Sequence, residues 1–144
     1  MKKAVILILF SLLLPILAGC VERESSTPST PSSITWLGYE EGIQKGKQEG
    51  MPILVDFYAD WCPPCKKMDE DTYTDARVIQ MSQQFIMVKV NVDDEPMLSN
   101  AYKIKYIPTA VFLDSNGHEV YRKTGYADAS QFVNEMEKAL SMIK

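Results

Sequence analysis

A short apolar run leads into two cysteines that are separated by two prolines, in the segment Trp61-Cys62-Pro63-Pro64-Cys65. The apolar run, Ile53-Leu54-Val55-Asp56-Phe57-Tyr58, has the composition of a strand that is buried on both faces. Prolines directly after Cys62 suit the first turn of a helix, because the first N–H groups of a helix have no partner inside it. The partial positive charge at a helix N-terminus favours thiolate over thiol. This junction therefore predicts a cysteine pair that opens and closes as a disulfide, as in a dithiol oxidoreductase.

Length and charge limit the alternatives. With 144 residues and 46% hydrophobic content, the chain can form one compact domain with a core, but it is too short for two. Its formal net charge is -4, and no basic cluster occurs beyond pairs such as Lys66-Lys67, so no nucleic acid partner is expected. A Gly-rich dinucleotide fingerprint is missing as well, so we expect no cofactor.

The first 19 residues have the pattern of an export signal. Lys2-Lys3 precede an apolar stretch from Ala4 to Leu14, which is short for a membrane span and has the length of a signal-peptide core. The ending Leu17-Ala18-Gly19-Cys20 resembles the lipobox of prokaryotic lipoproteins, in which the cysteine is lipidated and the chain is cut just before it. We therefore expect a signal peptide over 1–19 and a lipid anchor on Cys20. An ordinary cleaved signal or an uncleaved anchor is the alternative.

Residues 20–33 connect this signal to the domain. They are rich in Ser, Thr and Pro and have almost no apolar content, which predicts a flexible tether followed by one domain over 34–144. Since Cys20 would carry lipid, Cys62 and Cys65 are the only thiols left on the exported domain. A disulfide that closes so small a ring stabilises a fold far less than one that closes a long loop. Redox chemistry is therefore a better explanation for the pair than a structural role.

The domain alternates predicted strands and helices. Asn116-Gly117 predicts a hairpin turn, and Asp128 with Gln131 forms a capping-box pattern before the last helix. Expected strands cover 34–36, 53–58, 85–92, 110–114 and 119–124, and expected helices cover 37–49, 63–71, 74–84, 93–103 and 128–143. This order predicts the α/β class, with a central mixed β-sheet and helices on both faces.

The same order, with a dithiol after the first long strand, resembles the thioredoxin fold. The segments that carry the resemblance are Val55 to Lys66, Lys89-Val90-Asn91-Val92-Asp93, Ile107-Pro108-Thr109 and Gly125. Together with Thr72 to Val78, they look most like the C-terminal domain of periplasmic thiol:disulfide interchange proteins. The chain departs from ordinary thioredoxin at Pro63, where that family has glycine, and it lacks the proline that kinks the active-site helix.

The resemblance assigns roles to several residues. It implies that Cys62 is the attacking thiol and that Cys65, one turn into the helix and largely buried, is the resolving thiol. Asp56 is an acid in an apolar strand, and burial raises a carboxyl pKa toward neutrality, so it is the expected base for Cys65. Lys89 in the neighbouring strand is expected to moderate Asp56. An Asp at an open sheet edge and a solvated Lys are the alternatives.

The two prolines predict the direction of the reaction. Pro63 and Pro64 remove two N–H donors that would otherwise bond the Cys62 thiolate, which leaves the Cys65 N–H as the nearest backbone donor. A less stabilised thiolate favours the disulfide over the reduced form. We therefore expect a reducing pair, with the alternative that the prolines only rigidify the turn.

The loop and aromatic residues complete the expected site. The resemblance implies a cis bond between Ile107 and Pro108, in a loop that packs against the dithiol and offers its backbone to an extended substrate segment. Trp61 and Tyr58 are expected to shield the site, and His118 in the hairpin turn is expected to be solvated.

These expectations combine into a monomeric, lipid-anchored, extracytoplasmic protein-disulfide reductase. Its expected partners are client proteins that contain disulfides and a membrane protein that supplies electrons. The opposite direction, as oxidase or isomerase, remains open. So do a module that holds Cu(I) on the two thiolates and a non-catalytic lipoprotein that uses the fold as an interaction surface.

Overall fold

The computed structural model describes residues 31–143, so the expected signal peptide, Cys20 and most of the tether lie outside the described residues. In chain order the elements are α1 (Tyr39–Glu49), β1 (Ile53–Tyr58), α2 (Pro63–Lys67), the π-helical turn η1 (Met68–Thr72), α3 (Ala76–Ser82), β2 (Ile86–Asn91), α4 (Pro96–Ala101), β3 (Thr109–Leu113), β4 (Glu119–Thr124) and α5 (Ala129–Met142).

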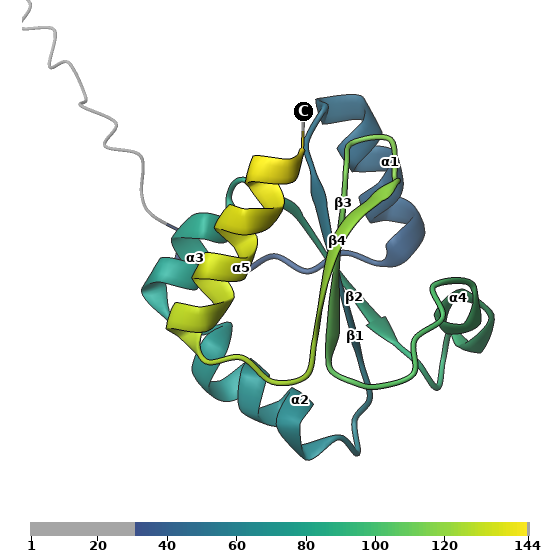
Figure 1. The fold of residues 1–144 in the computed structure, drawn as a ribbon, viewed down its shortest axis with the longest axis vertical. Coiled ribbons are helices and arrows are strands. Elements are labelled where there is room, and N and C mark those ends of the chain that lie inside the picture. Colours follow the sequence, from purple (N-terminus) through teal and green to yellow (C-terminus); the bar gives the residue numbers. More distant parts are fainter. Residues whose placement is uncertain (1–30, 144) are drawn as a thin grey trace, which may run out of the picture.

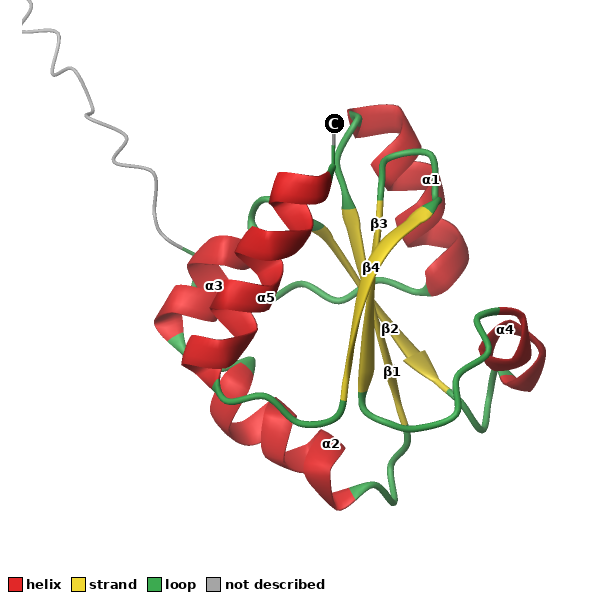
Figure 2. Ribbon diagram, viewed as in Figure 1, coloured by secondary structure: helices red, strands yellow, loops and turns green. Residues whose placement is uncertain are grey.

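The four strands form one mixed sheet in the order β2-β1-β3-β4. β1 runs parallel to β2 and antiparallel to β3, and β3 pairs with β4 as an antiparallel hairpin (Figure 2). Helices α2, α3 and α5 lie on one side of the sheet, and α1 and α4 lie on the other (Figure 1). This is the thioredoxin fold, and the predicted fold class is confirmed.

The buried sheet explains the apolar run that precedes the cysteines. β1 lies inside the sheet, and its side chains alternate between two cores. Ile53, Val55 and Phe57 pack toward α1 and α4, whereas Leu54 packs toward α3 and α5. Both faces of β1 are therefore apolar, and the acid at position 56 lies on the same face as Leu54.

Two glycines in α1 allow this helix to lie close to the sheet. A Cβ on Gly42 would come within 2.1 Å of a methyl group of Val88, and a Cβ on Gly46 within 2.5 Å of Ile53. Glycine inside a helix normally lowers its stability by roughly 1 kcal/mol. Here the close approach of α1 to β1 and β2 explains why glycine occupies both positions.

The strand expected over residues 34–36 is not present. Only Leu37 pairs with the sheet edge, where its N–H donates to the Met87 carbonyl at 2.9 Å and its carbonyl accepts from Lys89 N–H at 3.1 Å. Gly38 caps α1 directly afterwards, so the chain turns away from β2 after one residue. Trp36 instead packs edge-to-face on Tyr73, with ring centroids 5.0 Å apart.

The helix expected over residues 63–71 is interrupted. It begins at Pro63 as predicted, but after Lys67 it continues as the π-helical turn η1, in which the Tyr73 N–H donates to the Met68 carbonyl at 2.9 Å. A π-helical turn is wider than an α-helical one, and no proline lies in this segment. The strands expected over 53–58 and 119–124 have the predicted ends, and the remaining expected elements are present with shifted ends.

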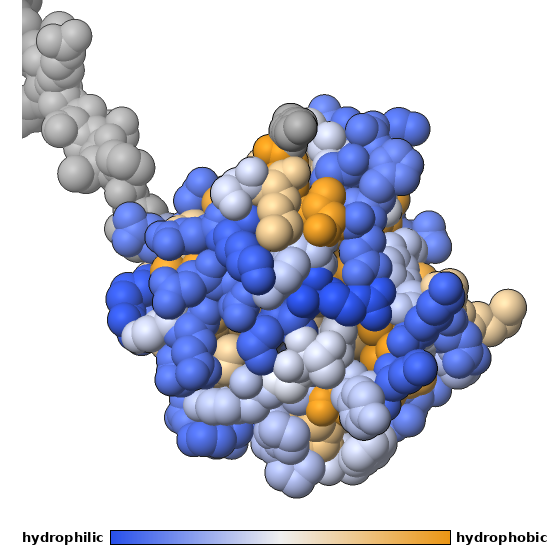
Figure 3. All heavy atoms as spheres, viewed as in Figure 1, coloured by the Kyte–Doolittle hydropathy of each residue, from blue (hydrophilic) through white to orange (hydrophobic). Residues whose placement is uncertain are grey.

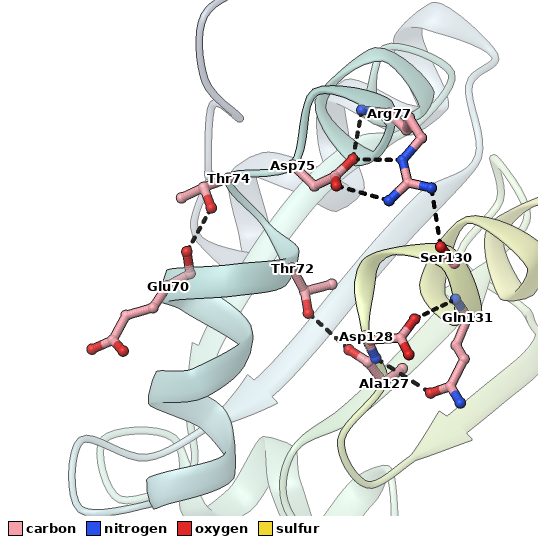
Figure 4. A network of polar contacts seen from close by, with 9 residues as sticks. All are labelled: Glu70, Thr72, Thr74, Asp75, Arg77, Ala127, Asp128, Ser130 and Gln131. Carbon is pink, nitrogen blue, oxygen red and sulfur yellow. Dashed lines mark hydrogen bonds and ion pairs between the residues drawn. The ribbon is translucent and has the colours of Figure 1, made fainter.

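A polar network holds η1 and α3 against the start of α5 (Figure 4). The buried Thr72 hydroxyl donates to the Ala127 carbonyl at 2.8 Å, and Arg77 bonds the Ser130 hydroxyl at 3.0 Å. The predicted capping box is formed, because Asp128 accepts from the Gln131 N–H while the Gln131 side chain accepts from the Asp128 N–H. The face of the domain seen in Figure 3 is mostly hydrophilic, with small separate hydrophobic patches.

Candidate active site

The two cysteines lie at the junction between β1 and α2. They are joined as a disulfide, with the sulfur atoms 2.05 Å and the Cα atoms 5.3 Å apart. Cys62 is the N-cap of α2, and Pro63 and Pro64 occupy its first two positions. The Cys65 N–H donates to the Cys62 sulfur at 3.2 Å. This is the donor that remains when two prolines precede it, as the sequence predicts.

Both cysteines are buried, which the sequence predicts for Cys65 but not for Cys62. Their exposed fractions are 2% for Cys62 and 4% for Cys65. They form a small cluster with Ala59, against which Tyr58, Val92 and Ile107 pack. The disulfide is therefore enclosed by these neighbours and does not project into solvent.

The rim of the site carries a tryptophan. Trp61 is 65% exposed, and its indole N–H donates to the Asp93 carboxylate at 2.8 Å. With Val92, Tyr106 and Ile107 it lines a hollow of about 170 Å³ beside the cysteines. Trp61 thus forms a wall of this hollow, and its shielding of the disulfide stays a prediction.

The loop before β3 contacts the cysteine cluster through Ile107. The Ile107–Pro108 peptide bond is cis, as the resemblance implies. The Pro108 carbonyl accepts from the Gly125 N–H at 2.8 Å, and the Thr109 hydroxyl donates to the Tyr106 carbonyl at 2.7 Å. These bonds hold Ile107 against the disulfide.

Asp56 is buried in the middle of the sheet, at 2% exposure. Its Cα neighbours are Lys89 on β2 and Ala110 on β3, so the alternative of an open sheet edge is wrong. Burial raises the pKa of Asp56 to about 7; the Asp69 carboxylate adds to the rise, while Lys89 and Tyr73 oppose it. A carboxyl group with this pKa can accept and release a proton near neutral pH.

Lys89 is only partly buried, and it lies among aromatic rings. Its Nζ forms an ion pair with Asp69, and it sits 4.5 Å from the ring centroid of Tyr58 and 5.3 Å from that of Trp36. The alternative of a freely solvated lysine is therefore wrong. The lysine lowers the Asp56 pKa, as predicted.

The sequence reasoning missed Asp69 and Tyr73. Both affect the pKa of Asp56, and both follow Cys65 in steps of four residues. Residues four apart share one face of a helix, so this spacing was an available signal. His118 lies exposed in the hairpin turn beside Asp114, as expected.

The described residues contain neither a group of metal ligands nor a membrane-spanning helix. Within 31–143, no three His, Cys, Asp or Glu side chains are grouped so that they could hold a metal ion. In the same part of the chain, no helix has the length and apolar character needed to cross a membrane.

Comparison with known proteins places these features in a wider context. A family model described as a thioredoxin-like domain matches residues 39–140. The thiol:disulfide interchange protein DsbD of Tatumella citrea is 40% identical over 101 residues, which are 66% of this chain and 18% of that protein. The DsbD protein of Ralstonia nicotianae is 30% identical over 106 residues, 70% of this chain and 17% of that protein. The chain thus spans less than a fifth of the length of these curated relatives.

Solved structures agree on the fold. A thioredoxin from Thermus thermophilus is 26% identical with a TM-score of 0.69, over 75% of this chain and 88% of that one. A DsbH oxidoreductase is 22% identical with a TM-score of 0.71, over 83% and 93% of the two chains. The C-terminal domain of Neisseria meningitidis DsbD, in its reduced form, is 24% identical with a TM-score of 0.61, over 69% and 92%.

Proposed function

Since this chain belongs to the family of thioredoxin-like domains and is a thiol-disulfide oxidoreductase, we propose that it reduces disulfides in extracytoplasmic proteins. The observation that carries the proposal is a cysteine pair, joined as a disulfide, at the start of α2, next to the cis-proline loop and on the strand–helix junction that follows Asp56. Each part has a separate task in the reaction.

The reaction begins from the reduced pair. The Cys62 thiolate attacks one sulfur of a client disulfide; a Cys62–client bond forms, the client S–S bond breaks, and the second client sulfur leaves as a thiolate that takes up a proton. Cys65 then loses its proton to the Asp56 carboxylate and attacks the Cys62 sulfur. The Cys62–Cys65 bond forms, and the Cys62–client bond breaks, so that the remaining client sulfur leaves as a thiolate and takes up the second proton. Asp56 then releases the proton that it took from Cys65 to solvent. The client gains two electrons and two protons, and the enzyme pair is oxidised to the disulfide.

Asp56 suits this task because of its position. It faces the same side of the sheet as Leu54, on which α2 and η1 also lie, and its pKa is raised by burial to about 7. Cys65 must lose its proton in an apolar environment, where ionisation without a nearby base is unfavourable. Lys89 keeps part of the Asp56 population ionised at neutral pH.

The donors around Cys62 support the proposed direction of the reaction. A thiolate at an N-cap accepts hydrogen bonds from the following N–H groups, and within residues 31–143 the Cys65 N–H is the only donor to that sulfur. Strong oxidants of this chemistry stabilise their reduced form, in particular the thiolate. A thiolate with few donors therefore favours a reductant.

The N-terminal residues suggest where the reaction takes place. We infer an export signal over 1–19, a lipid on Cys20, a tether over 20–33 and the catalytic domain over 34–144. A lipid anchor and a flexible tether would keep the domain near an extracytoplasmic membrane surface. A membrane protein that carries electrons would then reduce the Cys62–Cys65 disulfide again, and we expect the domain to act as a monomer.

Trapping tests the proposal directly. In full-length Cys65→Ala protein the second step cannot occur, so clients stay covalently attached to Cys62 and are released by a reducing agent. Cys62→Ala is the matched control and should capture nothing. If Cys65→Ala captures no protein while the wild type reduces disulfides, the two-step scheme is wrong.

A redox titration tests the direction. Equilibration of the Cys62–Cys65 pair with glutathione should give a reduction potential more negative than about -150 mV, well below the about -120 mV of a strong oxidase. A value above about -150 mV would favour an oxidase or isomerase instead. Stoichiometric copper binding without any disulfide reductase activity would favour a metal-binding module.

A further inference from the structure

Among residues 31–143, two buried side-chain polar atoms lack hydrogen-bond partners. They are Oδ1 of Asp56 and the hydroxyl oxygen of Tyr73, in residues that are 2% and 5% exposed. Buried polar groups are normally paired, because they lose their bonds to water without replacement otherwise. Both groups lie in the same core, because Tyr73 packs there with Leu54 and Asp56 lies on the face of β1 that carries Leu54. In addition, the hydroxyl opposes the effect of burial on the pKa of Asp56, and the carboxyl adds to the effect of burial in raising the pKa of Tyr73. A donor and an acceptor thus lie together without a formed bond of good geometry.

The ring of Tyr73 is held firmly in place. It packs edge-to-face against Trp36 at 5.0 Å and against Phe132 at 5.4 Å, measured between ring centroids. Its N–H donates to the Met68 carbonyl and closes the π-helical turn. A phenylalanine would make the same packing contacts, so the hydroxyl itself is not needed to fill the core.

The other ionisable groups near Asp56 come from three elements. Lys89 of β2 lowers its pKa and Asp69 of η1 raises it, and these two side chains form an ion pair with each other. Tyr58, on the same strand, lies under the Lys89 ammonium group, and Asp56 contributes to a raised Tyr58 pKa. Lys89 is thus shared between Asp69 and aromatic rings, whereas the Tyr73 hydroxyl has no other partner in the described part of the chain.

We propose that Tyr73 is a positioning residue whose hydroxyl donates a hydrogen bond to Asp56 when that carboxyl group is ionised. The bond stabilises the carboxylate over the neutral acid, so it extends to lower pH the range in which Asp56 accepts the Cys65 proton. The proton moves from the Cys65 sulfur to a carboxylate oxygen of Asp56, and Tyr73 keeps its own. This inference rests on the proposed function, in which Asp56 is the base for Cys65.

Tyr73→Phe is the variant that tests it. Reduced full-length protein is mixed with a chromogenic aromatic disulfide in a stopped-flow instrument; the first release of chromophore reports attack by Cys62, and the second, concentration-independent release reports attack by Cys65. In the wild type the second rate should fall below the Asp56 pKa. In Tyr73→Phe the midpoint should move up by about half a pH unit, and the rate on the acid side should fall about threefold. At high pH the two rates should agree.

Controls separate this role from a structural one. Tyr39→Phe also removes a tyrosine hydroxyl, but from α1 on the opposite side of the sheet, and should leave the midpoint unchanged. In an Asp56→Asn background, Tyr73→Phe should have no effect on the second rate at any pH. A Tyr73→Phe protein that melts like the wild type and has an unshifted midpoint would overturn the inference.

The proposed function fails in a different way. If Asp56→Asn leaves the pH dependence of the second rate intact, Asp56 is not the base, whatever Tyr73 does. A measurement on wild-type protein needs no variant: the ring-carbon NMR signal next to the Tyr73 hydroxyl should titrate with the same midpoint as the Asp56 carboxyl carbon. A Tyr73 signal that stays constant through that midpoint would exclude the hydrogen bond.

Discussion

Replacing Asp56 with Asn should make the oxidised protein more stable at neutral pH. The folded state raises the Asp56 pKa from 3.8 to about 7, chiefly through burial, so the folded protein holds the proton more tightly than the unfolded chain does. The wild type therefore loses stability as the pH rises from about 4 to 7. Each pKa unit corresponds to about 1.4 kcal/mol, so the penalty approaches about 4 kcal/mol above pH 7.

Asn keeps the shape of the side chain and removes this penalty, although its amide group must still be buried. We therefore expect Asp56→Asn to raise the free energy of unfolding by about 2–4 kcal/mol at pH 8. At pH 4 the increase should be much smaller, because the wild-type acid is protonated in the folded state and about half protonated in the unfolded chain. Urea denaturation of the disulfide form, followed by circular dichroism at several pH values, measures both free energies. The disulfide form is used because its cysteines do not titrate.

Asp60→Asn is the matched control, since it removes an exposed acid from the segment between β1 and the cysteines. It should change the free energy of unfolding by less than about 0.5 kcal/mol at every pH. The reasoning is refuted if the difference between wild type and Asp56→Asn is the same at pH 4 and pH 8, because then Asp56 would have the same pKa folded and unfolded.

Three other substitutions test separate parts of the structure. Gly42→Ala should lower the free energy of unfolding by about 1–3 kcal/mol in urea denaturation, because the new Cβ meets a sheet side chain at 2.1 Å; Gly38→Ala, with open space around it, should cost less than about 1 kcal/mol. Thr72→Val should cost about 1–3 kcal/mol in the same assay because it leaves a buried carbonyl without its donor, whereas Thr74→Val at an exposed bond should cost less than about 0.5 kcal/mol. Pro64→Ala restores an N–H donor to the Cys62 thiolate, so the reduction potential measured against glutathione should become less negative by about 30 mV; an unchanged or more negative value would contradict the donor argument.

Local patterns predicted most of the secondary structure and the start of the site. The capping box at Asp128 and the prolines after Cys62 act on groups a few residues away, so the sequence alone places them. The prediction of a strand over 34–36 was wrong. Pairing at this sheet edge is limited by the point at which the chain turns into α1, and the packing of α1 on the sheet sets that point. The π-helical turn after Lys67 has no proline or glycine to mark it in the sequence.

For the chemistry of the site, too, one part can be predicted from neighbouring residues and another part depends on tertiary packing. The type of reaction depends on two cysteines three positions apart at a helix start, and both features can be read from neighbouring residues. The pKa of Asp56 depends on Lys89, Asp69 and Tyr73, which come together only when β1, β2 and η1 pack. Burial and Coulomb interactions act through space over a few ångströms, so distances along the chain do not reveal their strength.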